Sequence, residues 1–224
     1  MPSNFVELAI LGLLPNQSLH SLSFTSSLQK ILNTLSSTPG ALTFQSRRSV
    51  SPTSTQLLLA IWTDRSAHDY LDVHGIAPKL LKEMFTRVKP EIVHFMDLDV
   101  GQLDLDAGVL GVDIFHAKDG KRLEFDQGVK KFGRVGGWYV FKGVPAAPMV
   151  MPNDERELEI IRMQKERAEK AMGEKVPDVW VGISDSAGEA ERDGFRHRTK
   201  DLVETCVSGR WEKFFVGKKD TDKN

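Results

Sequence analysis

The chain has 224 residues, of which 30 are lysine or arginine, 31 are aspartate or glutamate and one is cysteine. This balance argues against nucleic acid or an anionic membrane as the main partner, and the single cysteine excludes an internal disulfide. No run approaches the roughly 18 apolar residues that a membrane span requires. The N-terminal MPSNFVELAILGLLPN also lacks the basic start and the cleavage site of a signal peptide, so we expect a cytoplasmic protein.

The first 100 residues predict the element order β-α-β-β-α-β, which is the ferredoxin-like arrangement. Glu7 is the one charged interruption of the first apolar run, so it lies either at a strand edge or at a special place in the structure. A polar link at 63–66 feeds a helical stripe that ends near Val88, before Lys89 and Pro90 break it. The other predicted elements are strands at 5–14, 41–50, 57–62 and 91–98 and a helix at 22–35.

The chain repeats this pattern after an acidic linker at 101–108. We infer an internal duplication, with one ferredoxin-like repeat at 1–100, a second at 109–218 and a tail at 219–224 that we expect to be disordered. Cys206 falls in the last predicted helix of the second repeat, where we expect a buried structural thiol. The predicted elements of this repeat are strands at 109–117, 138–144, 178–185 and 210–216 and helices at 122–132 and 189–207.

The second repeat contains an insertion at 145–177, whose middle predicts a helix at 153–173. Asn153 is the cap candidate, acidic residues occupy the first turn and Gly173 ends the helix. Two interpretations remain open. The thin apolar stripe favours a solvated surface helix held by charge pairs, whereas the flanking apolar, proline-rich VPAAPMVMP favours a lid over a pocket.

Two short motifs in the first repeat resemble a known group of proteins. They are Trp62-Thr63-Asp64-Arg65-Ser66-Ala67 and Asp69-Tyr70-Leu71 with His74. Together with the element order, they resemble the dimeric α/β-barrel superfamily, which includes antibiotic-biosynthesis monooxygenases and small polyketide cyclases. The resemblance implies an α+β fold in which two fused ferredoxin-like βαββαβ repeats form an α/β barrel. Such a chain closes the barrel by itself or pairs as a homodimer.

The resemblance also implies that His74 is a general base paired with Tyr70, which would donate a hydrogen bond to a carbonyl or enolate oxygen. The alternative is an exposed helix histidine beside a packed tyrosine. His94 and Asp113 are further acid-base candidates, because apolar neighbours on a strand disfavour the charged form; a satisfied core histidine and a water-exposed strand-edge carboxylate are their alternatives. The predicted substrate-binding residues are Trp62, Glu7, Met96, Phe115, Trp138 and Trp180.

We expect the ligand to lie inside the barrel, where strands turn one face inward. No metal site or cofactor is predicted, because the histidine pair His68 and His74 falls on different faces of a helix and no phosphate-binding loop occurs. The predicted function is a cofactor-independent enzyme of secondary metabolism, a cyclase or monooxygenase acting on a polyketide-like or aromatic small molecule. The alternatives are a non-catalytic barrel that carries an apolar ligand and a dimerisation scaffold with a filled core.

Overall fold

A computed structural model of the chain describes residues 3–51, 54–143, 145, 148–149, 152–172, 177–185 and 189–217. No helix within these ranges has both the length and the apolar character needed to cross a membrane. The first half contains β1 (Asn4–Leu13), α1 (Leu22–Ser36), β2 (Ala41–Ser49), β3 (Thr55–Trp62), α2 (Arg65–Val73), α3 (Ile76–Met84) and β4 (Val88–Leu98). The second half contains β5 (Val109–Ala117), α4 (Arg122–Lys131), β6 (Gly136–Trp138), α5 (Glu155–Met172), β7 (Val179–Asp185), α6 (Glu189–Thr199) and β8 (Val203–Gly217).

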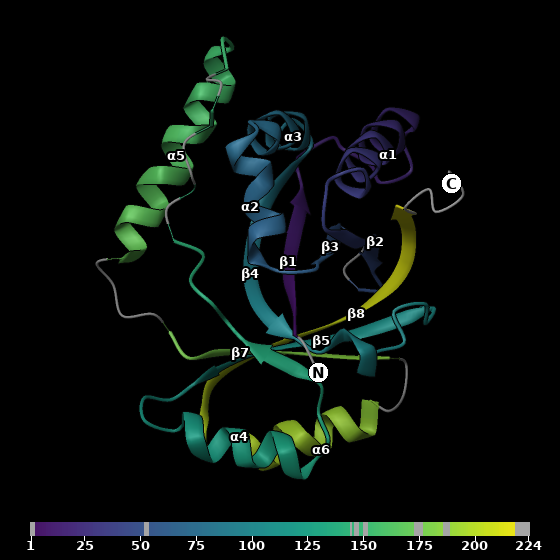
Figure 1. Cartoon of the computed structure of the whole chain (residues 1–224). Helices are drawn as coiled ribbons and strands as arrows, with labels where there is room; N and C mark the ends of the chain where they lie inside the picture. Colours follow the sequence, from purple (N-terminus) through teal and green to yellow (C-terminus); the bar gives the residue numbers. More distant parts are fainter. Residues whose placement is uncertain are drawn as a thin grey trace, which may run out of the picture.

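All eight strands form one antiparallel sheet in the order β4-β1-β3-β2-β8-β5-β7-β6. Each half therefore has its fourth strand beside its first and its third beside its second, which confirms the predicted pair of fused ferredoxin-like repeats. The β2–β8 pairing joins the two halves (Figure 1). Among the described residues, an isolated bridge between Met96 and Tyr139 and a hydrogen bond from the Val140 N–H to the Phe95 carbonyl (2.7 Å) link β4 to the segment after β6. No strand ladder joins β4 to β6, so the sheet is not closed.

The inward faces of the two repeats pack against each other. Along β1, Val6, Leu8 and Ile10 share one face because side chains alternate along a strand. These residues join a single apolar cluster with side chains from the second repeat. The space in which we expected a ligand is thus occupied by packed side chains: Val6, Leu8, Ile10, Leu57, Leu59, Ile61, Met96, Leu98, Leu110, Val112, Ile114, Val179, Val181, Ile183 and Trp211.

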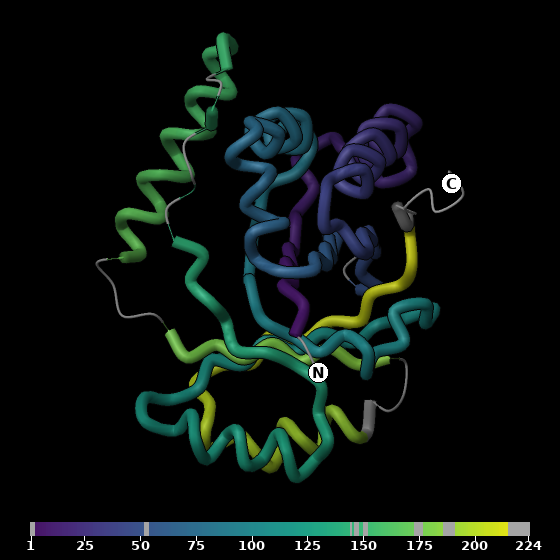
Figure 2. The backbone as a smooth tube through the Cα atoms, viewed as in Figure 1, coloured from purple at the N-terminus to yellow at the C-terminus, as the bar shows by residue number. Residues whose placement is uncertain are grey.

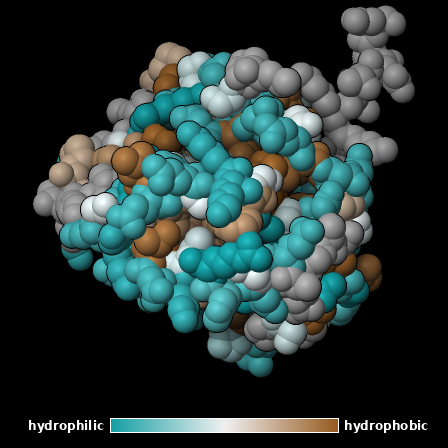
Figure 3. All heavy atoms as spheres, turned by 90° about the horizontal axis from the view of Figure 1, so that it is seen from below, coloured by the Kyte–Doolittle hydropathy of each residue, from teal (hydrophilic) through white to brown (hydrophobic). Residues whose placement is uncertain are grey.

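Helices cover the outward faces of both repeats. The helices α1, α2 and α3 lie on the first repeat, and α4 and α6 lie on the second (Figures 1 and 2). Under α4 and α6, the core is an aromatic cluster of Phe115, Phe125, Trp180 and Phe195. Seen from below, the surface is mainly hydrophilic with separate apolar patches (Figure 3). Each sheet half therefore has a second core on its helix side, with different contents in the two repeats.

Three predicted elements differ from the structure. The helical stripe after the 63–66 link is two helices, because Gly75 adopts the left-handed conformation (φ 65°) between α2 and α3. The strand predicted at 138–144 is only the three-residue β6. The helix predicted at 189–207 ends at Thr199, and Cys206 lies on β8 instead, because β-branched residues alternate from Val203 onward. Burial raises the pKa of the half-buried Cys206 thiol.

The predicted linker 101–108 is tied to the first repeat by a buried arginine. Arg47 on β2 is 0% exposed, and its guanidinium donates hydrogen bonds to the carbonyl oxygens of Leu105 (2.7 Å) and Ala107 (3.0 Å). A third hydrogen bond runs from Nε to the side chain of Gln45 (3.0 Å). Arg47 therefore holds the connection between the repeats and satisfies backbone oxygens that the fold takes out of water.

We expect Arg47→Met to lower the free energy of unfolding by about 2 to 4 kcal/mol, because it leaves two carbonyl oxygens without their charged donor. The matched control is Arg48→Met, since the neighbouring arginine is half-buried and pairs at the surface with Glu212 (2.5 Å). That change should cost at most about 1 kcal/mol. Urea unfolding followed by tryptophan fluorescence measures both, and equal losses in the two variants would contradict the assigned role of Arg47.

Candidate functional site

A cavity of about 350 Å³ lies on the helix side of the first repeat. Its floor is formed by outward-facing residues of β1 and β4, such as Ala9 and Phe95, and its walls by α2 and α3. The insertion helix α5 closes the remaining side with Ile160 and Ala168, which are 2% and 9% exposed. The second repeat thus supplies a cover for the pocket of the first, in the position that Figure 1 shows beside α2 and α3.

The cover helix α5 is fixed at its start. Asp154, rather than the predicted Asn153, caps it, since its Oδ1 accepts hydrogen bonds from the backbone N–H groups of Arg156 (3.0 Å) and Glu157 (3.2 Å). Lys82 on α3 pairs with both Asp154 and Glu157. Because α5 packs on α3 and lines the cavity, the lid interpretation describes its position better than a fully solvated helix does.

An ion pair between Glu7 and His68 lies at the floor of this pocket. Glu7 projects from β1, which lies between β3 and β4 and is not an edge strand. His68 on α2 is 4% exposed, and its Nε2 is 3.3 Å from Glu7 Oε2. Both residues line the cavity. The imidazole is held by ring contacts with centroid distances of 5.3 to 5.5 Å to Phe5, Trp62 and Phe95.

The two partners stabilise each other's charged form. Burial is the largest influence on Glu7 and would raise its pKa, but the contact with His68 and the charges of His68 and Lys142 outweigh it, so the pKa of Glu7 is lowered. Burial would likewise lower the pKa of His68, but the carboxylates of Asp69 and Glu7 outweigh it, so this pKa is raised. The pocket therefore holds an imidazolium–carboxylate pair at slightly acidic pH.

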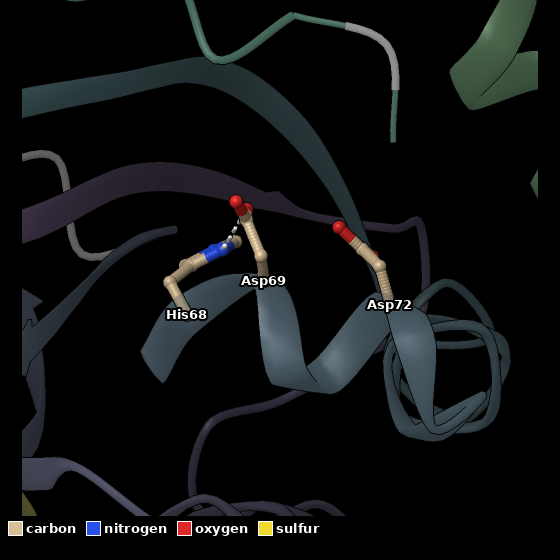
Figure 4. Close-up of side chains that lie close together, drawn as sticks. All are labelled: His68, Asp69 and Asp72. Atoms are coloured by element: carbon tan, nitrogen blue, oxygen red, sulfur yellow. Dashed lines mark ion pairs between the residues drawn. The ribbon is translucent and has the colours of Figure 1, made fainter. Parts of the chain in front are cut away.

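Asp69, Asp72 and Lys142 complete a polar cluster with this pair. Lys142 Nζ lies 2.6 Å from Asp72 Oδ2 and 4.0 Å from Asp69 Oδ1. The lysine comes from the segment after β6, and its ammonium group also lies 5.6 Å from the ring centroid of Phe95. Figure 4 shows the side chains of His68, Asp69 and Asp72 projecting from α2 toward the same side of the helix, with Asp72 further along it. We call Glu7, His68, Asp69, Asp72 and Lys142 the polar cluster.

The tyrosine–histidine pair that the resemblance singled out forms, but outside the pocket. Tyr70 and His74 stack with ring centroids 3.8 Å apart, and His74 is exposed at the end of α2. Neither residue lines the cavity. The buried face of the same helix carries His68, Leu71 and Asp72 instead. Their i, i+3, i+4 spacing was the signal in the sequence that could have identified His68.

The predicted residues His94 and Met96 lie on the inward face of β4, away from the cavity. Met96 is fully buried in the cluster between the repeats. The His94 ring packs against Tyr139 at a centroid distance of 5.3 Å. Burial and the nearby His116 lower the pKa of His94 to about 4, so its imidazole is neutral near pH 7. Trp62 is 0% exposed and does not line the cavity. Its ring contacts the ring of His68 and so supports the polar cluster.

The remaining predicted residues belong to the second repeat. Asp113 is 1% exposed and accepts hydrogen bonds from Arg134 (2.9 Å), Arg192 (2.9 and 3.1 Å) and Ser208 (2.5 Å). Phe115 and Trp180 are aromatic core residues, and Trp138 donates a hydrogen bond to Asp126 (2.8 Å). None of these predicted residues lines the 350 Å³ cavity.

The two repeats use equivalent positions differently. Glu7 lies opposite Ala60 on the third strand of its repeat, and Asp113 lies opposite Gly182 on the third strand of the second. Each carboxylate meets a cationic side chain from the helix that follows the third strand, namely His68 or Arg192. In the first repeat a cavity adjoins this pair, whereas in the second the aromatic cluster and further arginines surround it.

No protein-family model matches the chain, and no curated protein matches its sequence. Solved structures match over almost the whole length. A proposed monooxygenase from Fusobacterium nucleatum has a TM-score of 0.60 at 8% identity, with 97% of this chain and 95% of that protein covered. An anthrone oxidase-like protein has a TM-score of 0.55 at 8% identity, with 99% and 97% covered. A proposed chlorite dismutase has a TM-score of 0.56 at 10% identity, with 96% of each chain covered.

The chain has the α+β fold of these barrel-type structures, with its eight-stranded sheet open between β4 and β6. This agrees with the resemblance found in its sequence at the level of architecture. At these identities the likeness concerns the fold alone, since one architecture supports many activities. The features of this protein that bear on its function are therefore the pocket and the polar cluster.

We expect the Glu7–His68 pair to stabilise the fold in a limited pH window. The lowered pKa of Glu7 gives stability that is present above its ordinary value of 4.5 and is lost as the pH falls through its folded-state value. The raised pKa of His68 gives stability that is complete below its ordinary value of 6.5 and is lost as the pH rises through its folded-state value. Both contributions are therefore present together between 4.5 and 6.5.

Urea unfolding of the wild type and Glu7→Gln across this range measures the effect. The difference in free energy of unfolding should be largest near about pH 5.5, on the order of 1 kcal/mol, and should shrink at more acidic and more alkaline pH. Glu204→Gln, on the exposed side of β8, is the control and should show no such maximum. A pH-independent difference for Glu7→Gln would contradict the ion pair.

Proposed function

We propose that the protein is an oxidase- or monooxygenase-type enzyme that removes a proton from a planar aromatic or polyketide-like molecule in the pocket under α5. The observation that carries this proposal is the Glu7–His68 pair at the floor of an otherwise largely apolar cavity. The fold neighbours described as monooxygenases and as anthrone oxidase-like support the reaction class. The proposal retains the substrate class predicted from the sequence and assigns the chemistry to other residues.

The size and lining of the pocket suit such a substrate. A cavity of about 350 Å³ falls within the range of roughly 300 to 1,000 Å³ that is usual for small-molecule sites. Phe95, Tyr139 and Phe141 contribute aromatic surface, and Leu80 and Ile160 contribute aliphatic surface. Aromatic side chains stack on flat rings, so a fused-ring ligand can be buried here with one polar edge toward the polar cluster.

The polar cluster provides the groups for proton abstraction. Glu7 reaches the cavity as an ionised carboxylate and can accept a proton from a phenol or from a carbon activated by a neighbouring carbonyl. His68 positions this carboxylate through the 3.3 Å contact. Lys142, whose side chain is 14% exposed, offers a positive charge close to the site where the substrate oxygen becomes negative. Dioxygen is the oxidant of the next step: the substrate carbanion forms a carbon–oxygen bond to it, uptake of one proton gives a hydroperoxide, and loss of water leaves a carbonyl group.

A panel of anthrone-type and phenolic polyketide compounds, assayed by dioxygen consumption and product absorbance, tests this function. Glu7→Gln should lower kcat/KM by about 10² to 10⁴, the usual contribution of a positioned base. His74→Ala and Tyr70→Phe should keep wild-type kcat/KM, because neither residue lines the cavity.

If His74→Ala or Tyr70→Phe lowers kcat/KM and Glu7→Gln does not, the reaction takes place at the end of α2, where the sequence resemblance suggested it. Ligand binding by the wild type and by Glu7→Gln with equal affinity, and without turnover by either, would instead support the non-catalytic carrier. If no compound binds, both the enzyme and the carrier function are excluded for this pocket.

A further inference from the structure

Three side chains of α2, of which His68 and Asp72 line the pocket, bring possible metal ligands together. His68, Asp69 and Asp72 each offer one ligand atom, and these atoms all lie within 4.8 Å of one another. His68 and Asp72 are four residues apart and therefore lie one above the other on the same helix face, as Figure 4 shows. An imidazole nitrogen and carboxylate oxygens are ordinary ligands of divalent transition metals.

One nitrogen of the buried histidine lacks a hydrogen-bond partner. His68 is 4% exposed, and its Nδ1 is buried without a hydrogen bond, since the nearest carboxylate oxygen, Asp69 Oδ1, is 3.7 Å away. Its other nitrogen, Nε2, is paired with Glu7. A carboxylate on one imidazole nitrogen holds the proton there and leaves the lone pair of the other nitrogen for a metal ion. Nδ1 is thus at ion-pair distance from Asp69 but makes no hydrogen bond, and an ion shared with Asp69 and Asp72 would give it a partner.

The charge of the cluster favours a cation. Three carboxylates, those of Glu7, Asp69 and Asp72, surround His68, and one buried ammonium group, that of Lys142, faces them. Arg65 approaches the second oxygen of Asp69 at 3.8 Å, but both of these side chains are substantially exposed. The carboxylates of the cluster therefore outnumber its one ammonium group.

We propose that His68 Nδ1, Asp69 and Asp72 bind a divalent transition-metal ion in competition with Lys142. The lysine ammonium group occupies part of the space that the metal ion would fill, because it contacts Asp72 at 2.6 Å and lies 4.0 Å from Asp69. Lys142 belongs to no helix or strand, so it can withdraw without breaking a ladder of backbone hydrogen bonds. The site then alternates between a lysine-filled and a metal-filled state.

The ligand set also indicates which ions fit. One imidazole and two carboxylates suit Mn²⁺, Fe²⁺, Co²⁺ or Zn²⁺ better than Ca²⁺ or Mg²⁺, which prefer all-oxygen coordination. Three protein ligands from one helix occupy one side of the ion. His68 and Asp72 line the cavity, so we expect the other coordination positions to be reached from it by water or by an oxygen atom of a bound molecule.

Titration of the chelator-treated full chain with Co²⁺, by calorimetry and by visible absorption of the bound ion, tests this site. Lys142→Met removes the competing ammonium and should tighten Co²⁺ binding at least about tenfold, whereas Glu7→Gln, which loosens the support of His68, should weaken it about 10- to 100-fold. Asp72→Asn should abolish the absorption of the bound ion. His74→Ala is the matched control on the same helix and should bind like the wild type.

Two results would overturn the metal site. One is the absence of saturable Co²⁺ binding in both the wild type and Lys142→Met. The other is binding that Asp72→Asn leaves unchanged, which would indicate adventitious surface carboxylates only. The Lys142→Met arm keeps the test valid if Asp72→Asn fails to fold.

The metal site shares its pocket with the proposed enzyme but is measured without turnover. Co²⁺ binding with no activity toward any compound would retain the site and remove the function. If Asp72→Asn still turns over substrate and neither the wild type nor Lys142→Met binds Co²⁺, the proposed function is retained and the metal site is removed.

Discussion

The packing of the two repeats through their inward strand faces is the constraint on which the rest of the structure depends. Val6, Leu8 and Ile10 of the first repeat share one apolar cluster with Val112 and Ile114 of the second. Burial of this surface contributes on the order of 25 cal/mol per Å² and holds the fused sheet halves together. Because the inward faces are used for packing, the cavity lies on the outward face, between the strands that form its floor and the helices that cover it.

The duplication explains why a carboxylate occurs at equivalent places in both repeats and why only one of them is a candidate site. Asp113 is enclosed by arginines and sits beside the ring cluster of Phe115, Phe125, Trp180 and Phe195, an arrangement that stabilises the second repeat. Glu7 instead meets a histidine, whose charge can change near neutral pH, and a cavity. The same backbone positions thus support an ion pair enclosed in the core of one half and an ion pair that lines a cavity in the other.

The insertion helix α5 converts the surface groove of the first repeat into a covered pocket. It belongs to the second repeat in the sequence, yet its buried residues Ile160 and Ala168 face the first. Lys82 anchors its first turn through Asp154 and Glu157. Lys142 precedes the insertion, in the segment that leads from β6 toward α5, so this connection brings a charged group to the polar cluster before the insertion supplies the cover.

The sequence by itself determined most of the fold. Alternating and helical apolar spacing marked the strands and helices of both repeats, and the repetition of their order revealed the duplication, because these patterns are local consequences of backbone geometry. Helix ends were less certain: Gly75 divides one expected helix, and Cys206 falls on a strand where the β-branched pattern overrides the helical one.

Only the tertiary structure decided the site. His68 looked isolated in the sequence because its partner Glu7 lies 61 positions earlier, on β1. Lys142 likewise lies 70 positions after its partner Asp72. Neither contact follows from local spacing. Which face of the sheet holds a cavity depended on how the two repeats pack, and whether the insertion helix covers that cavity depended on the few contacts that attach it to α3. Long-range packing brings these side chains together, and no local pattern records it.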